Sequence, residues 1–352
     1  MLRPQDVGYR VVVRRVAESR AGRTLYTDAI GELVELTETD LTLATPTGRL
    51  RVPLSAVHRA KRVPPPRRPT AAAMIELELA ADEGWPAPVH ERLGEWVLRA
   101  ADGWTGRANS ALAVGDPGRP LPDAIDEVQR WYAARGQPAL ITVPLPLARP
   151  VSAELDARGW GARPTVLAQT ASIADILAAT DTDRSHLPPV ELATAPSDGW
   201  LALVARRKNG LPDAARHVLT AVDQVRFAHV YAPQPVSPNG SGSPEPGSGS
   251  PALDSASPEA DHGSPELVGI ARGTITGHRR WLGLTLVEVL PAARRQGLAQ
   301  HMIRALAEWA SSLGVTNAYL HVVGDNVAAT ALYRKLGFRT HHTYETRIAP
   351  TG

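Results

Sequence analysis

The sequence predicts a mixed α/β (α+β) protein in three parts, of which the first is a small all-β domain. Alternating apolar and polar runs, separated by turn residues, fill residues 1–62 and predict short strands. Beyond residue 70, apolar runs of strand length alternate with segments that have the 3.6-residue period of helices. Proline-rich breaks divide the chain, and we expect domains at residues 1–62, 70–180 and 189–348.

The composition limits the class of protein. Of the 352 residues, 43% are hydrophobic and 21% are charged, which excludes a wholly disordered chain. The sequence has no run of about 18 apolar residues and no apolar N-terminal stretch, so we expect neither a membrane span nor a secretory signal. The lack of cysteine excludes disulfides, thiolate metal sites and a cysteine nucleophile. We therefore expect a cytoplasmic protein, and we predict no metal site.

The first 62 residues predict a small β-barrel. Strands are expected at residues 9–16, 30–36, 41–44 and 50–54, with about one more to complete the set. Pro46-Thr47-Gly48 predicts a hairpin turn. In size and strand rhythm the segment resembles SH3-like barrels, and this resemblance covers no catalytic residue. The basic run at 58–62 has no interleaved aromatic residues and the net charge is only +2, so nucleic acid is not an expected partner.

Residues 70–180 combine strands with two helices. Strands are expected at 95–100, 108–114, 139–143 and 164–170, and helices at 123–135 and 152–158. Asp123 is suited to cap the first helix, and Gly136 to end it. The run Arg107-Ala108-Asn109-Ser110 is conspicuous, but it matches no mechanism.

Residues 189–348 have a similar order of elements. Helices are expected at 212–222, 298–313 and 327–336, and strands at 225–231, 267–275, 281–290, 318–323 and 342–348. Between two of these strands, 21 of the 34 residues at 233–266 are Pro, Gly or Ser, and none is Lys or Arg. Such a segment buries too little apolar surface to offset its ordering entropy, so we predict a disordered loop there.

The most informative stretch joins the strand at 281–290 to the helix that follows. Arg294-Arg295-Gln296-Gly297-Leu298-Ala299 opens this helix through a turn of small residues. The free N–H groups and the positive dipole end of a helix N-terminus attract a phosphate or pyrophosphate. Gly297 and Ala299 allow close approach of the backbone, and the two arginines add cationic donors. An ordinary capped helix is the alternative.

These residues resemble the GCN5-related N-acetyltransferase (GNAT) family. Its acyl-CoA signature, Arg/Gln-x-x-Gly-x-Gly/Ala, is matched by Arg294, Gly297 and Ala299. The family also places an Asn after the next strand and a Tyr seven residues later, which Asn326 and Tyr333 match. The resemblance covers residues 191–347 and implies the GNAT acyl-CoA N-acyltransferase fold, with acetyl-CoA as co-substrate.

The resemblance also implies a role for each matched residue. Backbone groups of the strand would pair with the pantetheine arm, the loop would hold the pyrophosphate, and Asn326 would contact the cofactor. The strand residues are Val287, Glu288 and Val289, and the loop residues are Arg294, Arg295, Gln296, Gly297, Leu298 and Ala299. Tyr333 would lie near the sulfur and protonate the leaving thiolate, although a half-buried core tyrosine is the alternative.

Two residues are candidates for the base that accepts the amine proton. Some relatives carry a Glu on the strand before the Asn, five residues upstream of it, and His321 occupies that position here. A histidine is suited to this role near neutral pH. Glu288, on the strand that carries the pantetheine-binding backbone, is the other candidate. The sequence does not separate the two, and either could be a structural residue.

Residues 70–180 resemble a degenerate GNAT-like domain, so the chain is similar to tandem-type actinobacterial GNATs. The runs ALITVP…LDARGW and AYLHVV…LYRKLGF suggest an internal duplication. Pro120 and Pro122 remove N–H donors where a second pyrophosphate would bind. We expect this segment to shape the acceptor pocket or to serve as scaffold.

The sequence therefore predicts a GNAT-type N-acetyltransferase that acts by direct attack of a primary amine on acetyl-CoA. The acceptor is either a small molecule or a protein amine. The alternative is a non-catalytic acetyl-CoA sensor or scaffold with a closed acceptor pocket. The sequence does not give the oligomeric state.

Overall fold

The computed structural model describes residues 2–20, 23–45, 48–63, 69–208, 210–233 and 266–350. The chain forms two compact units, residues 1–68 and 69–352. Most of the predicted loop at 233–266, and residues 46–47 of the predicted hairpin turn, lie outside the described residues. Within them, no helix has the length and apolar character needed to cross a membrane.

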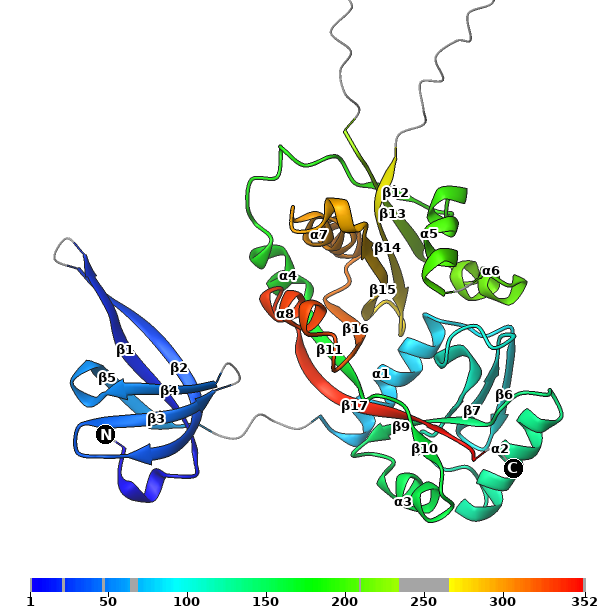
Figure 1. Ribbon diagram of the computed structural model, residues 1–352, viewed down its shortest axis with the longest axis horizontal. Coiled ribbons are helices and arrows are strands. Elements are labelled where there is room, and N and C mark those ends of the chain that lie inside the picture. The colour runs from blue at the N-terminus through cyan, green and yellow to red at the C-terminus, as the bar shows by residue number, and fades with distance from the viewer. Residues whose placement is uncertain are drawn as a thin grey trace, which may run out of the picture. The chain divides into compact units, whose positions relative to one another are not determined.

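The N-terminal unit is one antiparallel sheet of five strands in the order β4-β3-β2-β1-β5 (Figure 1). Its elements are η1 (Pro4–Asp6), β1 (Arg10–Arg20), β2 (Arg23–Leu36), β3 (Asp40–Thr45), β4 (Gly48–Pro53), η2 (Leu54–Ala56) and β5 (Val57–Arg62). Alternate residues of the strands face one core, which includes Val11, Val13, Leu33 and Leu43. The all-β prediction for this part is confirmed, whereas the likeness to SH3-like barrels stays a prediction.

The C-terminal unit is built on a single sheet of twelve strands. The order along the sheet is β12-β13-β14-β15-β16-β11-β17-β9-β8-β7-β6, and β10 pairs with β17 at the side. The strands are β6 (Val89–Leu93), β7 (Trp96–Ala100), β8 (Ala111–Leu112), β9 (Leu140–Leu145), β10 (Gly161–Ala162), β11 (Val166–Ser172), β12 (Glu191–Ala193), β13 (Val225–Tyr231), β14 (Leu267–Thr276), β15 (Trp281–Val289), β16 (Asn317–Val323) and β17 (Arg339–Ile348).

Helices connect and cover these strands. They are α1 (Ala71–Glu83), η3 (Arg107–Asn109), α2 (Leu121–Ala133), α3 (Arg149–Ala157), α4 (Ile173–Ala179), α5 (Asp198–Lys208), α6 (Asp213–Thr220), η4 (Pro291–Ala293), α7 (Leu298–Ser312) and α8 (Val327–Lys335). Two parallel strand pairs occur, β15 with β16 and β8 with β9. In each pair a helix crosses over between the strands, α7 in one and α2 in the other, which supports the internal duplication suggested by the sequence.

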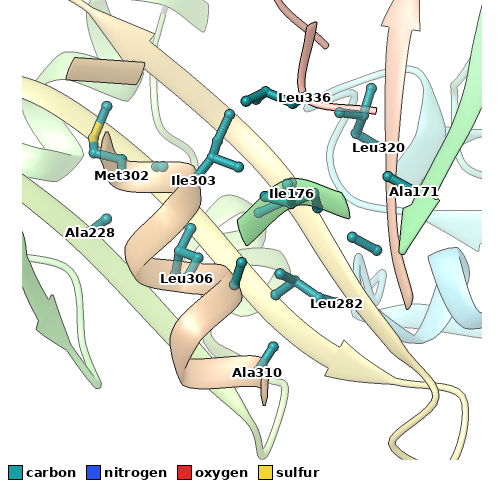
Figure 2. Close-up of a cluster of buried hydrophobic side chains, with 14 of the residues drawn as sticks. Ala171, Ile176, Ala228, Leu282, Met302, Ile303, Leu306, Ala310, Leu320 and Leu336 are labelled. Carbon is teal, nitrogen blue, oxygen red and sulfur yellow. The ribbon is translucent and has the colours of Figure 1, made fainter. Parts of the chain in front are cut away.

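The apolar face of α7 packs against the sheet and forms the main core. Figure 2 shows Met302, Ile303, Leu306 and Ala310 directed from α7 toward the strands. These positions follow the helical period of three and four residues, which is the pattern that predicted the helix. This packing holds the N-terminal end of α7 in place, where the predicted pyrophosphate loop lies.

The two segments that we expected to be separate domains, 70–180 and 189–348, share one sheet. Strand β11 belongs to the first segment, yet it lies between β16 and β17 of the second (Figure 1). Ala168 of β11 pairs with His321 on one side and with His342 on the other. The period of a strand predicts which of its faces is buried but not which neighbours it pairs with, so the sequence could not show this exchange.

Several elements differ from the sequence prediction, among them the short strands β6, β10 and β12, which were not expected. Helices α1, α4 and α5 were not expected, and the predicted strand at 108–114 is a 3₁₀ turn, η3, followed by the two-residue β8. In α1 the buried face contains Glu78 and Asp82 together with Leu77 and Ala81. These acidic residues interrupt the apolar pattern by which a helix is recognised.

Candidate functional site

The C-terminal unit contains a cavity of about 460 Å³, and both halves of its sheet contribute to the walls. Residues from the later half include Leu284, Val287, His321, Asn326, Tyr333 and Tyr344. Residues from the earlier half include Trp85, Thr105, Gly106, Arg107, Arg163 and Val166. The earlier half therefore shapes one side of the cavity, as one of our two expectations for it proposed.

The cavity opens where β15 and β16 separate. These parallel strands pair only from Trp281 to Leu284, opposite Asn317 to Leu320. At Leu286 the backbone adopts a positive φ of 53°, and the pairing with β14 shifts register in this region. Such a bulge bends a strand and frees backbone groups from pairing. Val287 follows the bulge and lines the cavity, whereas Glu288 and Val289 pair with β14.

The predicted pyrophosphate loop forms the turn into α7. Arg295 and Gly297 both have positive φ, at 64° and 87°, and Gly297 is the residue before the first helical turn. A left-handed backbone at this point explains why glycine is required. Arg294, Arg295 and Gln296 are exposed, Ala299 is half-buried and Leu298 is buried in the core. Arg294 Nε donates a hydrogen bond to the Val289 carbonyl at 3.0 Å.

The N–H groups at this helix end are suited to an anion. The first helical bond joins His301 N–H to the Gly297 carbonyl, and the N–H groups before it have no acceptor within the helix. Arg184, which the sequence analysis missed, lies beside the turn and donates to Gln300 Oε1 at 3.3 Å. The loop residues therefore fit a pyrophosphate, because they combine free donors, a left-handed glycine and positive side chains.

Asn326 and Tyr333 lie on α8 and face the same cavity. The Asn326 side chain caps the helix by accepting from Ala329 N–H at 3.1 Å, which leaves its amide N–H groups for another partner. The Tyr333 ring packs edge-on against Phe338, with 5.8 Å between the ring centres. Burial raises the pKa of Tyr333, so its hydroxyl keeps its proton and can act as a donor.

His321 projects from β16 into the cavity with both ring nitrogens unpaired among the described residues. Its side chain is 3% exposed. Burial lowers the pKa of His321 well below its ordinary value, and the positive charges of Arg107 and Arg99 act in the same direction. The imidazole is therefore neutral near neutral pH, which is the state that a proton acceptor needs.

A buried carboxylate stands behind His321. Glu78 of α1 is 5% exposed, and its Oε1 lies 3.7 Å from His321 Nε2 and 2.7 Å from His342 Nε2. His321 and His342 flank Ala168 in the sheet register, so a small side chain leaves room for the carboxylate between them. His341 occupies a register shift in β17, which brings its Nδ1 within 2.9 Å of His342 Nδ1.

The other candidate base, Glu288, is placed differently. Its carboxylate accepts from Arg207 Nη1 at 3.1 Å, and its side chain is not among those that line the cavity. His321 and Tyr333 thus line the same cavity, whereas Glu288 forms an ion pair with Arg207 and does not line it.

The conspicuous run at residues 107–110 builds one wall of the cavity. Asn109 folds the preceding loop, because its Oδ1 accepts from Ala101 N–H and Gly103 N–H at 2.8 and 2.9 Å. Arg107 projects from η3 and donates to the Tyr344 hydroxyl at 3.3 Å. The sequence signal was therefore real, but its meaning depended on β17, which lies more than 200 residues further along the chain.

No cluster of three or more His, Asp or Glu side chains suited to a metal ion occurs in the part of the chain that the structure describes.

Comparisons with known proteins agree with this geometry. A family model described as "Probable histone acetyltransferase Rv0428c C-terminal" matches residues 71–237 and 253–347. The protein named probable histone acetyltransferase Rv0428c, from Mycobacterium tuberculosis, is 29% identical over 345 residues, which cover 96% of this chain and 93% of that protein. The protein named uncharacterized N-acetyltransferase YobR, from Bacillus subtilis, is 24% identical over 78% of this chain and 97% of its own length.

Among solved structures, a GCN5-related N-acetyltransferase from Kribbella flavida superposes with a TM-score of 0.54 at 15% sequence identity. The match covers 80% of this chain and 96% of that chain, and it shows that the two share a fold. The predicted GNAT fold and acyltransferase activity are confirmed, and the non-catalytic alternative is not supported. Because the family model spans well over half of the sequence, the chain belongs to the Rv0428c C-terminal family and is an N-acetyltransferase of the GCN5-related type.

Proposed function

We propose that the protein transfers the acetyl group of acetyl-CoA to a primary amine by direct attack on the thioester. The observation that carries the proposal is the position of His321 and Tyr333 in one cavity, at the point where β15 and β16 separate. A proton acceptor and a proton donor thus face the space between the two strands.

The binding residues follow from the same geometry. Arg294, Arg295 and Gln296, with the N–H groups at Gly297, Leu298 and Ala299, would hold the pyrophosphate of acetyl-CoA. The strand residues Val287, Glu288 and Val289 would bind the pantetheine arm through their backbone groups. The free amide N–H groups of Asn326 would also contact the cofactor. Acetyl-CoA supplies the activated acyl group when it is bound.

Two proton transfers accompany the reaction. An alkylamine with a pKa of about 10 attacks only as the free base, and His321 accepts the proton that the amine nitrogen loses when the new C–N bond forms. Tyr333 donates its proton to the sulfur as the C–S bond breaks. Transfer of the proton from His321 back to Tyr333 restores both residues, so a neutral amine yields an amide and a thiol with no net change in protons.

Glu78 supports His321 in this scheme. The proton that His321 accepts leaves a positive charge in a buried site, where an uncompensated charge is costly. The carboxylate 3.7 Å away stabilises that charge, and the hydrogen bond with His342 fixes its position. Glu78 therefore acts through His321 as a positioning residue. Glu288 lacks this access to the cavity and is the weaker candidate for the base.

The test is a screen of amines with acetyl-CoA, in which thiol release and the mass of the product are measured. We expect Tyr333→Phe to reduce turnover roughly 10²-fold while acetyl-CoA affinity stays within a few-fold, because the ring and its packing remain and only the proton donor is lost. An unchanged turnover number would exclude the acid role of Tyr333. A protein that binds no acetyl-CoA in calorimetry would exclude the proposed function itself.

A further inference from the structure

The charged side chains that line the cavity all have the same sign. They are Arg107, Arg163 and Arg207, and no Asp, Glu or Lys lines the cavity in the described part of the chain. A positive wall of this kind attracts anions and repels cations. We propose that the acceptor is a small primary amine that also carries an anionic group, a carboxylate or a phosphate. This inference rests on the acetyl transfer proposed above and adds the substrate class.

Two of the three arginines form no ion pair among the described residues, although Arg107 also feels the negative charge of Glu78. Arg207 is neutralised by Glu288 at 3.1 Å. Arg107 instead has a neutral partner, since its Nη2 donates to the Tyr344 hydroxyl at 3.3 Å. Arg163 lines the cavity without forming an ion pair there. Arg107 is half-buried and Arg163 is exposed, and a guanidinium that is in no ion pair can bind an anionic ligand without first breaking one.

The Arg163 guanidinium lies beside the residue that precedes Arg107. A Cβ atom on Gly106 would lie 2.7 Å from Arg163 Nη1, so this guanidinium packs directly over the glycine next to Arg107. Gly106 has an ordinary helical φ of −64°, so its backbone conformation does not require glycine. The absence of a side chain at Gly106 therefore makes room for Arg163 beside Arg107.

This pair of arginines lies close to the proposed base. The ring of Tyr344 is 5.3 Å from the ring of His321, and its hydroxyl accepts the hydrogen bond of Arg107. The length of one tyrosine ring therefore separates the site for the amine from the site for the anion. An amine a few bonds from a carboxylate or phosphate spans this distance, and guanidinium groups bind both anions through paired hydrogen bonds.

The same positive charges assist the chemistry. Nearby cations favour the neutral form of an amine, just as they lower the pKa of His321. They also disfavour an acceptor that carries several positive charges, such as an aminoglycoside-like compound or a lysine-rich peptide.

The experiment compares pairs of acceptors that differ only in the anionic group. Phosphoethanolamine is compared with ethanolamine and β-alanine with propylamine, while putrescine and a lysine-rich peptide represent cations. Thiol release from acetyl-CoA gives kcat/KM for each. We expect kcat/KM for the anionic member of a pair to exceed that of its neutral partner about 10-fold or more. Comparison of the two pairs shows whether the site prefers a phosphate or a carboxylate.

Variants then locate the preference. We expect Arg107→Gln to reduce the ratio of kcat/KM for the anionic amine to kcat/KM for its neutral partner about 10-fold or more, and this ratio is the readout because loss of Arg107 also acts on the pKa of His321 and so on both amines. Gly106→Ala, which displaces Arg163, should act in the same direction more weakly. Arg280→Gln is the matched control, because Arg280 is exposed and pairs with Glu76 outside the cavity. Melting temperature and acetyl-CoA affinity report whether each variant is folded.

The outcomes separate this inference from the proposed function. If acetyl-CoA binds and neutral or cationic amines are acetylated as well as anionic ones, the inference is wrong and acetyl transfer stands. The same holds if the lysine-rich peptide is the best acceptor. If acetyl-CoA binds and no amine in the panel reacts, the inference is also rejected, whereas failure to bind acetyl-CoA overturns the proposed function.

Discussion

At the scale of single residues, the neutral side chain of His321 lies near two charged side chains of opposite sign, Arg107 and Glu78, and forms a hydrogen bond with neither. His321 has no hydrogen-bond partner among the described residues, while Arg107 on one side and Glu78 on the other make contacts with neighbouring side chains. Burial and, after it, the positive charge of Arg107 lower the pKa of His321 and keep the imidazole unprotonated, and the Glu78 carboxylate compensates the charge that forms when the imidazole accepts a proton. Glu78 is thus too far away to favour protonation of His321 through a hydrogen bond, yet close enough to stabilise the imidazolium after proton transfer.

The pH profile tests this balance. Rates should rise with pH as His321 loses its proton, through a pKa below the ordinary histidine value. Glu78→Gln removes the negative charge that favours the imidazolium, so the rising limb should move to lower pH and the plateau should fall roughly 10-fold. Other groups near His321 remain in this variant, namely Arg99, Arg107, Tyr319, His342 and Tyr344.

Kinetic measurements at a saturating acetyl-CoA concentration, across the pH range in which the protein stays folded, provide the profile. The matched control is Glu76→Gln, on the same helix but paired with exposed Arg280. A lower rate with an unmoved limb would mean that Glu78 is only structural, and Glu78→Asp should recover part of the wild-type profile.

At the scale of elements, the separation of β15 from β16 and the left-handed turn before α7 form the proposed binding site for acetyl-CoA. The strands pair for four residues and then part, and the turn presents free N–H groups at the helix end. Tyr231 pairs with Leu267, and Ala232 N–H donates to the Glu266 carbonyl at 2.8 Å, so the residues that flank the segment 233–266 lie at the end of β14 that pairs with Val289.

The turn can be tested against a second glycine of the same helix. Gly297 and Gly314 lie at the two ends of α7 with φ of 87° and 78°. Alanine at either position should cost stability by about 1 kcal/mol, because both force a side chain into the left-handed region. Only changes at Gly297 should weaken acetyl-CoA binding, and Gly297→Asp should weaken it 10-fold or more through charge repulsion.

Calorimetry with acetyl-CoA and thermal unfolding of the variants separate the two effects. Equal affinity for Gly297→Asp and the wild-type protein would show that the pyrophosphate binds elsewhere. A similar loss of affinity in Gly314→Ala would show that the effect comes from helix stability alone.

At the scale of the whole molecule, the sequence predicted the parts that local patterns determine. The strands at 225–231 and 281–290 and the helix at 298–313 match the structure almost to the residue, because their apolar periods are regular. The turn at Gly297 was found through a motif whose residues are adjacent in the chain. The role of Arg107 and the presence of Glu78 behind His321 were not predicted, since Tyr344 and His342, which contact them, lie on β17 far away in sequence.

The shared sheet predicts how the chain responds to truncation. A fragment of residues 69–352 contains a complete compact unit and should keep the acetyl-CoA-dependent rise in melting temperature. A fragment of residues 189–352 lacks β11 and α4. It would leave β16 and β17 without the strand between them and expose the apolar face of α7 that α4 covers.

We therefore expect the longer fragment to be folded and the shorter one to aggregate, because unpaired strand edges and exposed apolar surface favour association. Circular dichroism and size-exclusion chromatography of both fragments provide the measurement. A folded shorter fragment that binds acetyl-CoA would mean that the catalytic half stands alone and that the earlier half only adds a wall. If the longer fragment is folded but does not bind acetyl-CoA, then binding requires residues 1–68, and the expectation that residues 69–352 suffice is wrong.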